Sequence, residues 1–217
     1  SGEPATTGGG HDSEDHWSIA TPAFSRHGHT VDLDSAVLRH PAGWTATARL
    51  KVINASARSQ AELQVIDGTD IWDLWFCDGT EGMARGVYTR TASGTGDRQI
   101  SDIDPTADYH TYQIVFDPSG DAGRGSAAFY LDGRLVGSLT RAEAANNTSY
   151  RRFLWGDNTS LGPPSEARWS FAQFETGQRP ISECHEPFAD ADGDGDVDQT
   201  DFGLLQVCFT GPSTGQV

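Results

Sequence analysis

Alternating apolar and polar positions dominate the chain between residues 15 and 180, which is the pattern of an all-β protein. In residues 44–52 (WTATARLKV) every second side chain is apolar, so a β-strand here has one apolar and one polar face. Short runs of similar character, rich in β-branched and aromatic residues, predict further strands. They lie at residues 61–66, 71–77, 86–91, 109–116, 126–131, 135–139, 153–155 and 168–174.

Turns rather than helices separate these runs. Asp67-Gly68 and Asp132-Gly133 have the composition of tight turns between neighbouring antiparallel strands. Helical periodicity is hard to find before residue 180, apart from residues 140–145, which predict one short helical turn. The pattern therefore predicts an antiparallel β-sandwich of two sheets.

The acidic charge of the chain separates a body from a tail. The chain has 217 residues, 31 Asp plus Glu, 15 Lys plus Arg, and a formal net charge of -16. This balance argues against nucleic acid and membranes as partners, and no apolar run approaches the roughly 18 residues of a membrane-spanning helix. Residues 184–217 contain seven acidic residues and no Lys or Arg. We therefore expect a flexible Gly-rich arm at 1–14, a sandwich at 15–182 and a distinct tail at 183–217.

The tail carries the spacing of a calcium-binding loop. In the twelve residues that begin at Asp190, aspartate occupies positions 1, 3, 5, 7, 9 and 12, and Gly195 at position 6 permits the sharp turn of an EF-hand loop. Carboxylates at this spacing converge on one hard cation, whereas an acidic linker that is merely solvated needs no spacing. The predicted cofactor is therefore Ca²⁺. Its predicted ligands are Asp190, Asp192, Asp194, Asp196, Asp198 and Asp201.

The residues after this loop, Phe202-Gly203-Leu204-Leu205, extend the motif. Loop and extension together resemble a type I dockerin repeat, in the single-copy form of planctomycete-type exported proteins. The resemblance implies a short helix that begins near Thr200, calcium binding, secretion to the exterior or the cell surface, and a cohesin-like protein as a partner. Dockerins of cellulosomes have two such repeats, and this chain has one.

The three cysteines fit one disulfide and one thiol. Cys184 and Cys208 bracket the calcium loop, and Cys77 stands alone in the body. A disulfide between Cys184 and Cys208, with Cys77 as a buried thiol, is the simplest assignment. In the chain-entropy model this closure is worth about 3 to 4 kcal/mol. Disulfides persist in oxidising compartments, which agrees with export. Four N-glycosylation sequons begin at Asn54, Asn146, Asn147 and Asn158.

The body contains an ordered series of motifs. An aromatic-rich strand at 109–116 precedes a hairpin at 128–136 of the form hydrophobic, Asp-Gly, polar, Leu-Val. Trp155-Gly156-Asp157 and residues 169–177 follow later in the chain. This order resembles concanavalin A-like and laminin-G-like jelly rolls. The resemblance implies a jelly-roll sandwich and leaves function open, because that superfamily includes glucanases, lyases and lectins.

The catalytic motifs of the enzymes in that superfamily are absent from the sequence. Retaining glucanases need two closely spaced carboxylates, which appear as Glu-x-Asp-x-(x)-Glu, and no Glu of this chain has these companions. Lyases of the fold use Tyr-x-Lys and Gln-Ile-His elements, and neither occurs around Lys51, the only lysine, or elsewhere. We therefore expect no enzymatic activity, and a glycoside hydrolase of the same fold is the less favoured alternative.

A candidate ligand-binding surface lies in residues 72–76 (WDLWF). Strand alternation puts Asp73 and Trp75 on the face opposite the other three residues of this run. If those three are core, Asp73 and Trp75 line the open sheet beside Tyr88 or Arg90, where an aromatic face and polar groups suit a sugar ring. The alternative is that all six Trp residues pack in the core or at its rim.

Together these features predict a non-catalytic, secreted, calcium-binding jelly-roll protein. Its expected partner is a polysaccharide or glycan, in carbohydrate binding or cell-surface adhesion. The alternative is a structural subunit of an extracellular filament or surface assembly that self-associates through the N-terminal arm or the calcium half-site. Polymerisation that depends on calcium would distinguish the second function from the first.

Overall fold

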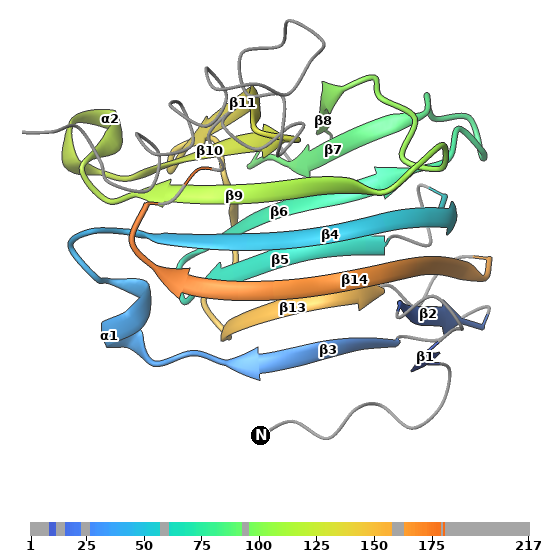
Figure 1. The fold of residues 1–217 in the computed structure, drawn as a ribbon. Helices are drawn as coiled ribbons and strands as arrows, with labels where there is room; N and C mark the ends of the chain where they lie inside the picture. Colours follow the sequence, from blue (N-terminus) through green and yellow to red (C-terminus); the bar gives the residue numbers. More distant parts are fainter. Residues whose placement is uncertain are drawn as a thin grey trace, which may run out of the picture.

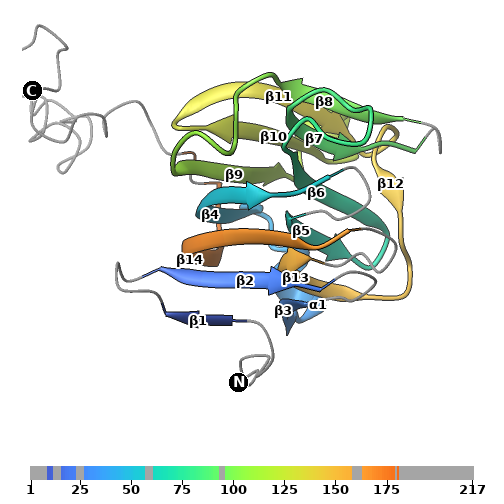
Figure 2. The same ribbon diagram turned by 90° about the vertical axis from the view of Figure 1, so that its right-hand side faces the viewer.

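The chain folds into two antiparallel β-sheets that lie face to face (Figures 1 and 2). The computed structural model describes residues 9–11, 16–22, 27–56, 61–92, 96–157, 163–178 and 180. Among these residues, no helix is both long and apolar enough to cross a membrane. The arrangement confirms the predicted all-β sandwich.

Each sheet has its own strand order. Sheet A contains, in spatial order, β1 (Gly9–His11), β2 (Trp17–Thr21), β14 (Ser165–Thr176), β4 (Trp44–Asn54), β9 (His110–Asp117), β10 (Ser126–Leu131) and β11 (Arg134–Thr140). Sheet B contains β3 (His27–Asp32), β13 (Arg151–Asp157), β5 (Ala61–Asp67), β6 (Asp70–Cys77), β7 (Gly86–Arg90) and β8 (Asp97–Ser101). The short β12 (Ala145–Asn146) pairs with the start of β6, and two four-residue helices, α1 (Ser35–Leu38) and α2 (Gly120–Gly123), lie in connections.

The core lies between the sheets because alternate residues of each strand point inward. In β4 the apolar set from Trp44 to Val52 is fully buried, and the Phe116 ring stacks on Trp44 at a centroid distance of 5.1 Å. Trp72 comes from sheet B and Trp169 from sheet A to the same core. Each large side chain buried in this way stabilises the fold by about 1.5 to 3 kcal/mol. The alternation found in the sequence therefore determines which face of each sheet packs against the other sheet.

All nine strands predicted from the pattern are present, and the pattern missed β1, β2, β3, β8 and β12. β3 (HGHTVD) and β8 (DRQIS) have partly or fully exposed residues throughout, so their sequences lack an apolar face. Residues 140–145 form one hydrogen-bonded turn, in which Ala144 N donates to Thr140 O at 3.1 Å, and then continue as β12. Part of the predicted N-terminal arm, Gly9–His11, pairs with β2 as edge strand β1.

Several predictions about the tail fall on residues outside the described part of the chain. They are the calcium ligands from Asp190 to Asp201, the helix after them, and the disulfide between Cys184 and Cys208. Cys77, by contrast, is described as a free and fully buried cysteine, as the assignment expected.

One carboxylate organises the turn between β5 and β6. Asp67 Oδ1 accepts hydrogen bonds from the backbone N–H groups of Thr69 and Asp70, both at 2.9 Å. Its Oδ2 accepts from Trp72 Nε1 at 3.1 Å and from Arg141 Nη2 at 3.0 Å. Asp67 therefore joins the predicted Asp-Gly hairpin turn to a core tryptophan and to Arg141, which directly follows β11 of the other sheet.

Candidate functional site

The face of sheet B that points away from the core carries a group of polar side chains. Because Leu63 and Val65 point into the core, their neighbours Glu62 and Gln64 point to the opposite face. The same alternation in β6 and β7 puts Asp73, Trp75 and Arg90 on that face. We call Glu62, Gln64, Asp73, Trp75 and Arg90 the outer-face cluster.

Strand register brings these residues together from distant parts of the sequence. Antiparallel pairing places Glu62 opposite Trp75 and Gln64 opposite Asp73. On the other side of β6, Arg90 N donates a hydrogen bond to Asp73 Oδ1 at 2.9 Å. Three neighbouring strands thus supply one cluster.

Arg90 joins the two carboxylates of the cluster. Its Nη2 lies 2.7 Å from Glu62 Oε2, and its Nη1 lies 3.0 Å from Asp73 Oδ2. The side chains of both Glu62 and Asp73 have no exposed surface, whereas that of Arg90 is 24% exposed. A buried carboxylate needs such a partner, because an unpaired buried charge is costly.

Burial also shifts the protonation of the cluster. It raises the pKa of Glu62 to about 7, and Arg90 offsets only part of this effect while Asp73 raises the pKa further. Burial alone would lower the pKa of Arg90, but Asp73 and Glu62 outweigh it, so the net shift is upward. Glu62 therefore exchanges its proton near neutral pH, which is unusual for a carboxyl group.

Two acceptor atoms of the cluster have neither a hydrogen bond nor an ion pair among the described residues. They are Glu62 Oε1 and Gln64 Oε1, and both atoms are buried. The other polar ends of these side chains are close to each other, since Gln64 Nε2 lies 3.5 Å from Glu62 Oε2. Two adjacent free acceptors on one face are suited to hydroxyl or amine donors of a ligand.

A small apolar cluster extends the same face beyond β6. Trp75 stacks on Tyr88 at 4.6 Å, and Cys77 and the partly buried Met83 pack against this pair. Tyr88 Oη donates to Ala84 O at 2.7 Å, which fastens the loop between β6 and β7 over the face. The four residues predicted to bind a ligand, Asp73, Trp75, Tyr88 and Arg90, thus lie together on one face as expected. The expected open surface is covered there, because Trp75 has no exposed area.

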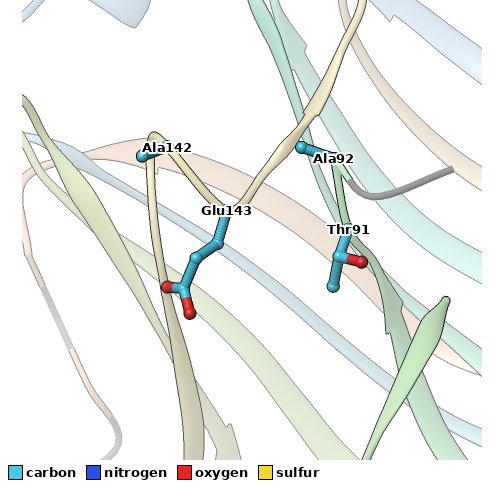
Figure 3. Close-up of a pocket in the computed structure, with 4 residues that line it drawn as sticks. All are labelled: Thr91, Ala92, Ala142 and Glu143. Carbon is cyan, nitrogen blue, oxygen red and sulfur yellow. The ribbon is translucent and has the colours of Figure 1, made fainter.

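A pocket of about 470 Å³ opens at the end of β7 (Figure 3). Its described lining consists of Thr91 and Ala92, which directly follow Arg90, and of Ala142 and Glu143 from the turn after β11. Ala92 N donates to Glu143 O at 2.7 Å, so the two segments are bonded to each other beside the pocket. Its volume falls in the range of roughly 300 to 1,000 Å³ that small-molecule sites occupy.

The described residues contain no group of three or more His, Cys, Asp or Glu that is arranged to hold a metal ion. The predicted calcium ligands lie in the tail, outside the part of the chain that the structure describes. Calcium binding therefore stays a prediction from the sequence.

Sequence reasoning missed Glu62 and Gln64. The catalytic motifs of glucanases lie within one strand, but Glu62 meets Arg90, and through it Asp73, across three strands. The signal was present in the alternation of AELQV, where both polar residues share the face opposite Leu63. The Asp67-Gly68 turn sets the pairing of the two strands, so this alternation puts Glu62 on the same face of the sheet as Trp75 and opposite it.

Comparisons with known proteins bear on the fold. No protein-family model matches the sequence, and no curated protein matches it. The alginate lyase from Corynebacterium sp. is similar in structure, with a TM-score of 0.51 and 10% identity over 79% of this chain and 82% of that chain. The binding domain of botulinum neurotoxin DC in complex with rat synaptotagmin II has a TM-score of 0.51 and 7% identity over 76% of this chain. The binding domain of serotype D/C VPI 5993 has the same two values over 92% of this chain.

The botulinum domains are longer than this chain, which matches 40% and 45% of their lengths. At 7 to 10% identity these likenesses speak to the fold alone. They support the jelly-roll sandwich that the sequence predicts.

Proposed function

We propose that this chain is a non-catalytic saccharide-binding domain whose ligand binds on the outer face of sheet B. The outer-face cluster carries the proposal. It combines free acceptors on Glu62 and Gln64, a guanidinium and an indole within three adjacent strands. Sugar recognition uses such sets, since hydroxyl groups exchange hydrogen bonds with polar side chains while ring faces pack on aromatic ones. A solved structure with this fold is named as an alginate lyase, which agrees with a saccharide ligand.

Access to the cluster requires movement of its cover. Glu62 and Trp75 have no exposed area, and the loop held by Tyr88 and Ala84 lies over the adjoining part of the face. The pocket next to Arg90 is the entrance that we propose, because it is lined by Thr91, at the end of the same strand, and by Glu143 from the turn after β11. A ligand hydroxyl that reached Glu62 Oε1 or Gln64 Oε1 would satisfy an acceptor that has no partner among the described residues.

The bonding of the carboxylates favours binding over catalysis. A retaining glycosidase needs one carboxylate free to attack the sugar and a second to donate a proton. Here Arg90 holds both Glu62 and Asp73 in ion pairs. Polysaccharide cleavage is the second candidate function, and one observation favours it: a carboxyl group with a pKa of about 7 suits a general acid.

Replacing Gln64 with leucine tests the binding site. We expect the wild-type chain to bind alginate or laminarin oligosaccharides in isothermal titration calorimetry, and Gln64→Leu to weaken that binding about tenfold, because one hydrogen bond is worth roughly 1 kcal/mol or more when its partner is left unsatisfied. Gln113→Leu is the matched control, since Gln113 is equally buried but lies in sheet A, where it donates to Thr47 Oγ1.

If the Gln64→Leu and Gln113→Leu variants bound the saccharide equally strongly, the outer face of sheet B would be ruled out as the saccharide site. The same incubations measure cleavage through new reducing ends or unsaturated products. If the wild-type chain formed such products and the Glu62→Gln variant did not, the enzymatic function would replace the binding function that we propose. The absence of binding to any of these oligosaccharides would count against the proposal.

We also propose that residues 190–201 bind Ca²⁺, on the spacing of their aspartates. Asp194→Asn removes one central carboxylate and should weaken calcium binding at least tenfold in calorimetry, against a wild-type dissociation constant of about 10⁻⁴ to 10⁻³ M, as in other extracellular modules. Asp121→Asn, in the described body, is the control for charge. Equal affinities in the two variants would exclude the loop as the site.

Together with calcium binding we propose that the chain is exported, that Cys184 and Cys208 form a disulfide, and that the tail binds a cohesin-like partner. The assembly alternative makes a separate prediction about size. Light scattering with calcium and then with chelator would show a polymer only if the calcium half-site joins copies of the chain. A monomer in both conditions leaves saccharide binding as the function that we propose.

A further inference from the structure

A second pocket, of about 170 Å³, lies at the end of the sandwich where α1 and α2 are found (Figure 1). Asp67 at the end of β5 contributes to it, whereas Glu62 near the start of β5 belongs to the outer-face cluster, so the two sites are separated by most of that strand. The pocket is lined by Leu38, Arg39, Asp67, Thr69, Phe116, Pro118, Arg124 and Arg141. Three of these eight residues are arginines, in a chain with a formal net charge of -16.

One of the three arginines is already committed to the protein. Arg141 pairs with Asp67 Oδ2 at 3.0 Å and with the carboxylate of Asp70, and its Nε donates to Arg124 O at 2.8 Å. Its guanidinium also lies 5.6 Å from the centroids of the Trp72 and Phe116 rings. Arg141 is thus held in place through all three of its nitrogens, Nε, Nη1 and Nη2.

The other two arginines differ from Arg141. Neither Arg39 nor Arg124 has an ion pair or a side-chain hydrogen bond among the described residues, and both side chains are exposed at the mouth of the pocket. Among the eight lining residues, three guanidinium groups meet one carboxylate, that of Asp67, so the lining carries net positive charge. Like charges gathered around one pocket repel each other unless an anion lies between them.

The rest of the lining is apolar apart from one hydroxyl-bearing residue. Leu38, Phe116 and Pro118 offer apolar surface, and Thr69 adds a polar group at the β5–β6 turn. The volume is below the roughly 300 Å³ at which sites for drug-sized ligands begin, so the pocket suits one small unit of a larger ligand. Guanidinium groups recognise carboxylate and sulfate through paired hydrogen bonds, and apolar walls suit the C–H face of a sugar ring.

We propose that this pocket binds one acidic sugar residue, whose carboxylate or sulfate group accepts hydrogen bonds from Arg39 and Arg124. The inference takes the saccharide from the proposed function, but the site is a different one. Arg141 stays bound to Asp67 and Asp70 and keeps the pocket in shape. The domain would then contact an acidic polysaccharide at two places.

An NMR titration of the ¹⁵N-labelled chain tests the pocket. Arginine Nε–Hε signals are followed as D-glucuronate is added at constant ionic strength, with D-glucose and inorganic sulfate as separate probes. We expect saturable shifts with glucuronate and none with glucose. Arg39→Gln and Arg124→Gln should each weaken glucuronate binding about tenfold, because each removes a charged hydrogen-bond donor from an exposed side chain.

Arg134→Gln is the matched control, since Arg134 is an exposed arginine of β11 outside the pocket. Equal weakening in all three variants would overturn the proposal in favour of non-specific attraction. Saturation by sulfate without any by glucuronate would overturn it in favour of a free-anion site. Gln64→Leu separates this result from the proposed function: glucuronate binding that survives Gln64→Leu but not Arg124→Gln supports the pocket even if the outer-face cluster binds nothing.

Discussion

Asp67→Ala is expected to lower the free energy of unfolding by about 3 to 5 kcal/mol, the cost of breaking a buried ion pair together with its hydrogen bonds. The carboxylate closes the β5–β6 turn through Thr69 and Asp70, and it satisfies the indole N–H of Trp72 in the core. It also holds Arg141, the residue that directly follows β11 of the other sheet. One substitution therefore loosens a turn, leaves a buried donor unpaired and removes a link between the sheets. Urea unfolding measured by tryptophan fluorescence gives the change.

Asp117→Ala is the matched control for this substitution. Asp117 closes a similar turn by accepting hydrogen bonds from Ser119 N at 2.8 Å and Ser119 Oγ at 2.7 Å, but it contacts neither a core tryptophan nor an arginine in those bonds. Its loss should cost about 1 kcal/mol, as for a surface side-chain hydrogen bond to the backbone. If the two variants were equally stable, the role of Asp67 as a link between the sheets would be refuted.

Stability should fall as pH rises from 5 to 8, and Glu62→Gln should remove that fall. The pKa of Glu62 is about 7 in the folded chain, against an ordinary value of 4.5, because burial disfavours its charged form. The folded state thus binds this proton more tightly than the unfolded state does. The stabilisation is complete below about pH 4.5 and is lost as pH rises through about 7, a change of about 3 kcal/mol.

The measurement is the free energy of unfolding in urea at several pH values, for wild type and Glu62→Gln. Glutamine keeps an oxygen that accepts from Arg90 and has no proton to lose. The difference between the two proteins isolates Glu62 from other titrating groups. His29 has the opposite effect, because burial lowers its pKa and its protonation destabilises the fold as pH falls below its ordinary value of 6.5. A difference that stays constant from pH 5 to 8 would contradict the shift at Glu62.

The fold was largely predictable from the sequence because its core strands alternate. Residues 44–52 carry one apolar face, and this period fixes which side chains meet between the sheets. β8 was not predictable in this way. It is a short strand with exposed and half-exposed side chains, and it exists because its backbone pairs with β7 rather than because it buries an apolar face.

The candidate sites were harder to predict because they depend on pairing across strands and connections. Alternation correctly put Asp73 and Trp75 on one face, but the cover over Trp75 comes from Met83 and the loop around it, which no local pattern announces. The smaller pocket, lined by three arginines, collects residues from position 38 to position 141. Nothing in the neighbourhood of Arg39 in the sequence indicates that Arg124 will lie beside it.

The place of β14 has a consequence for how the protein is made. This strand comes last in the described sequence, yet it lies between β2 and β4 in the middle of sheet A (Figure 1). While residues 165–176 are still being synthesised on the ribosome, β2 and β4 each have an edge whose partner does not yet exist. Such edges readily pair with other chains. Sheet A therefore reaches its final order only after translation has passed β14, and a nascent chain that stalls earlier exposes two adhesive edges to its neighbours.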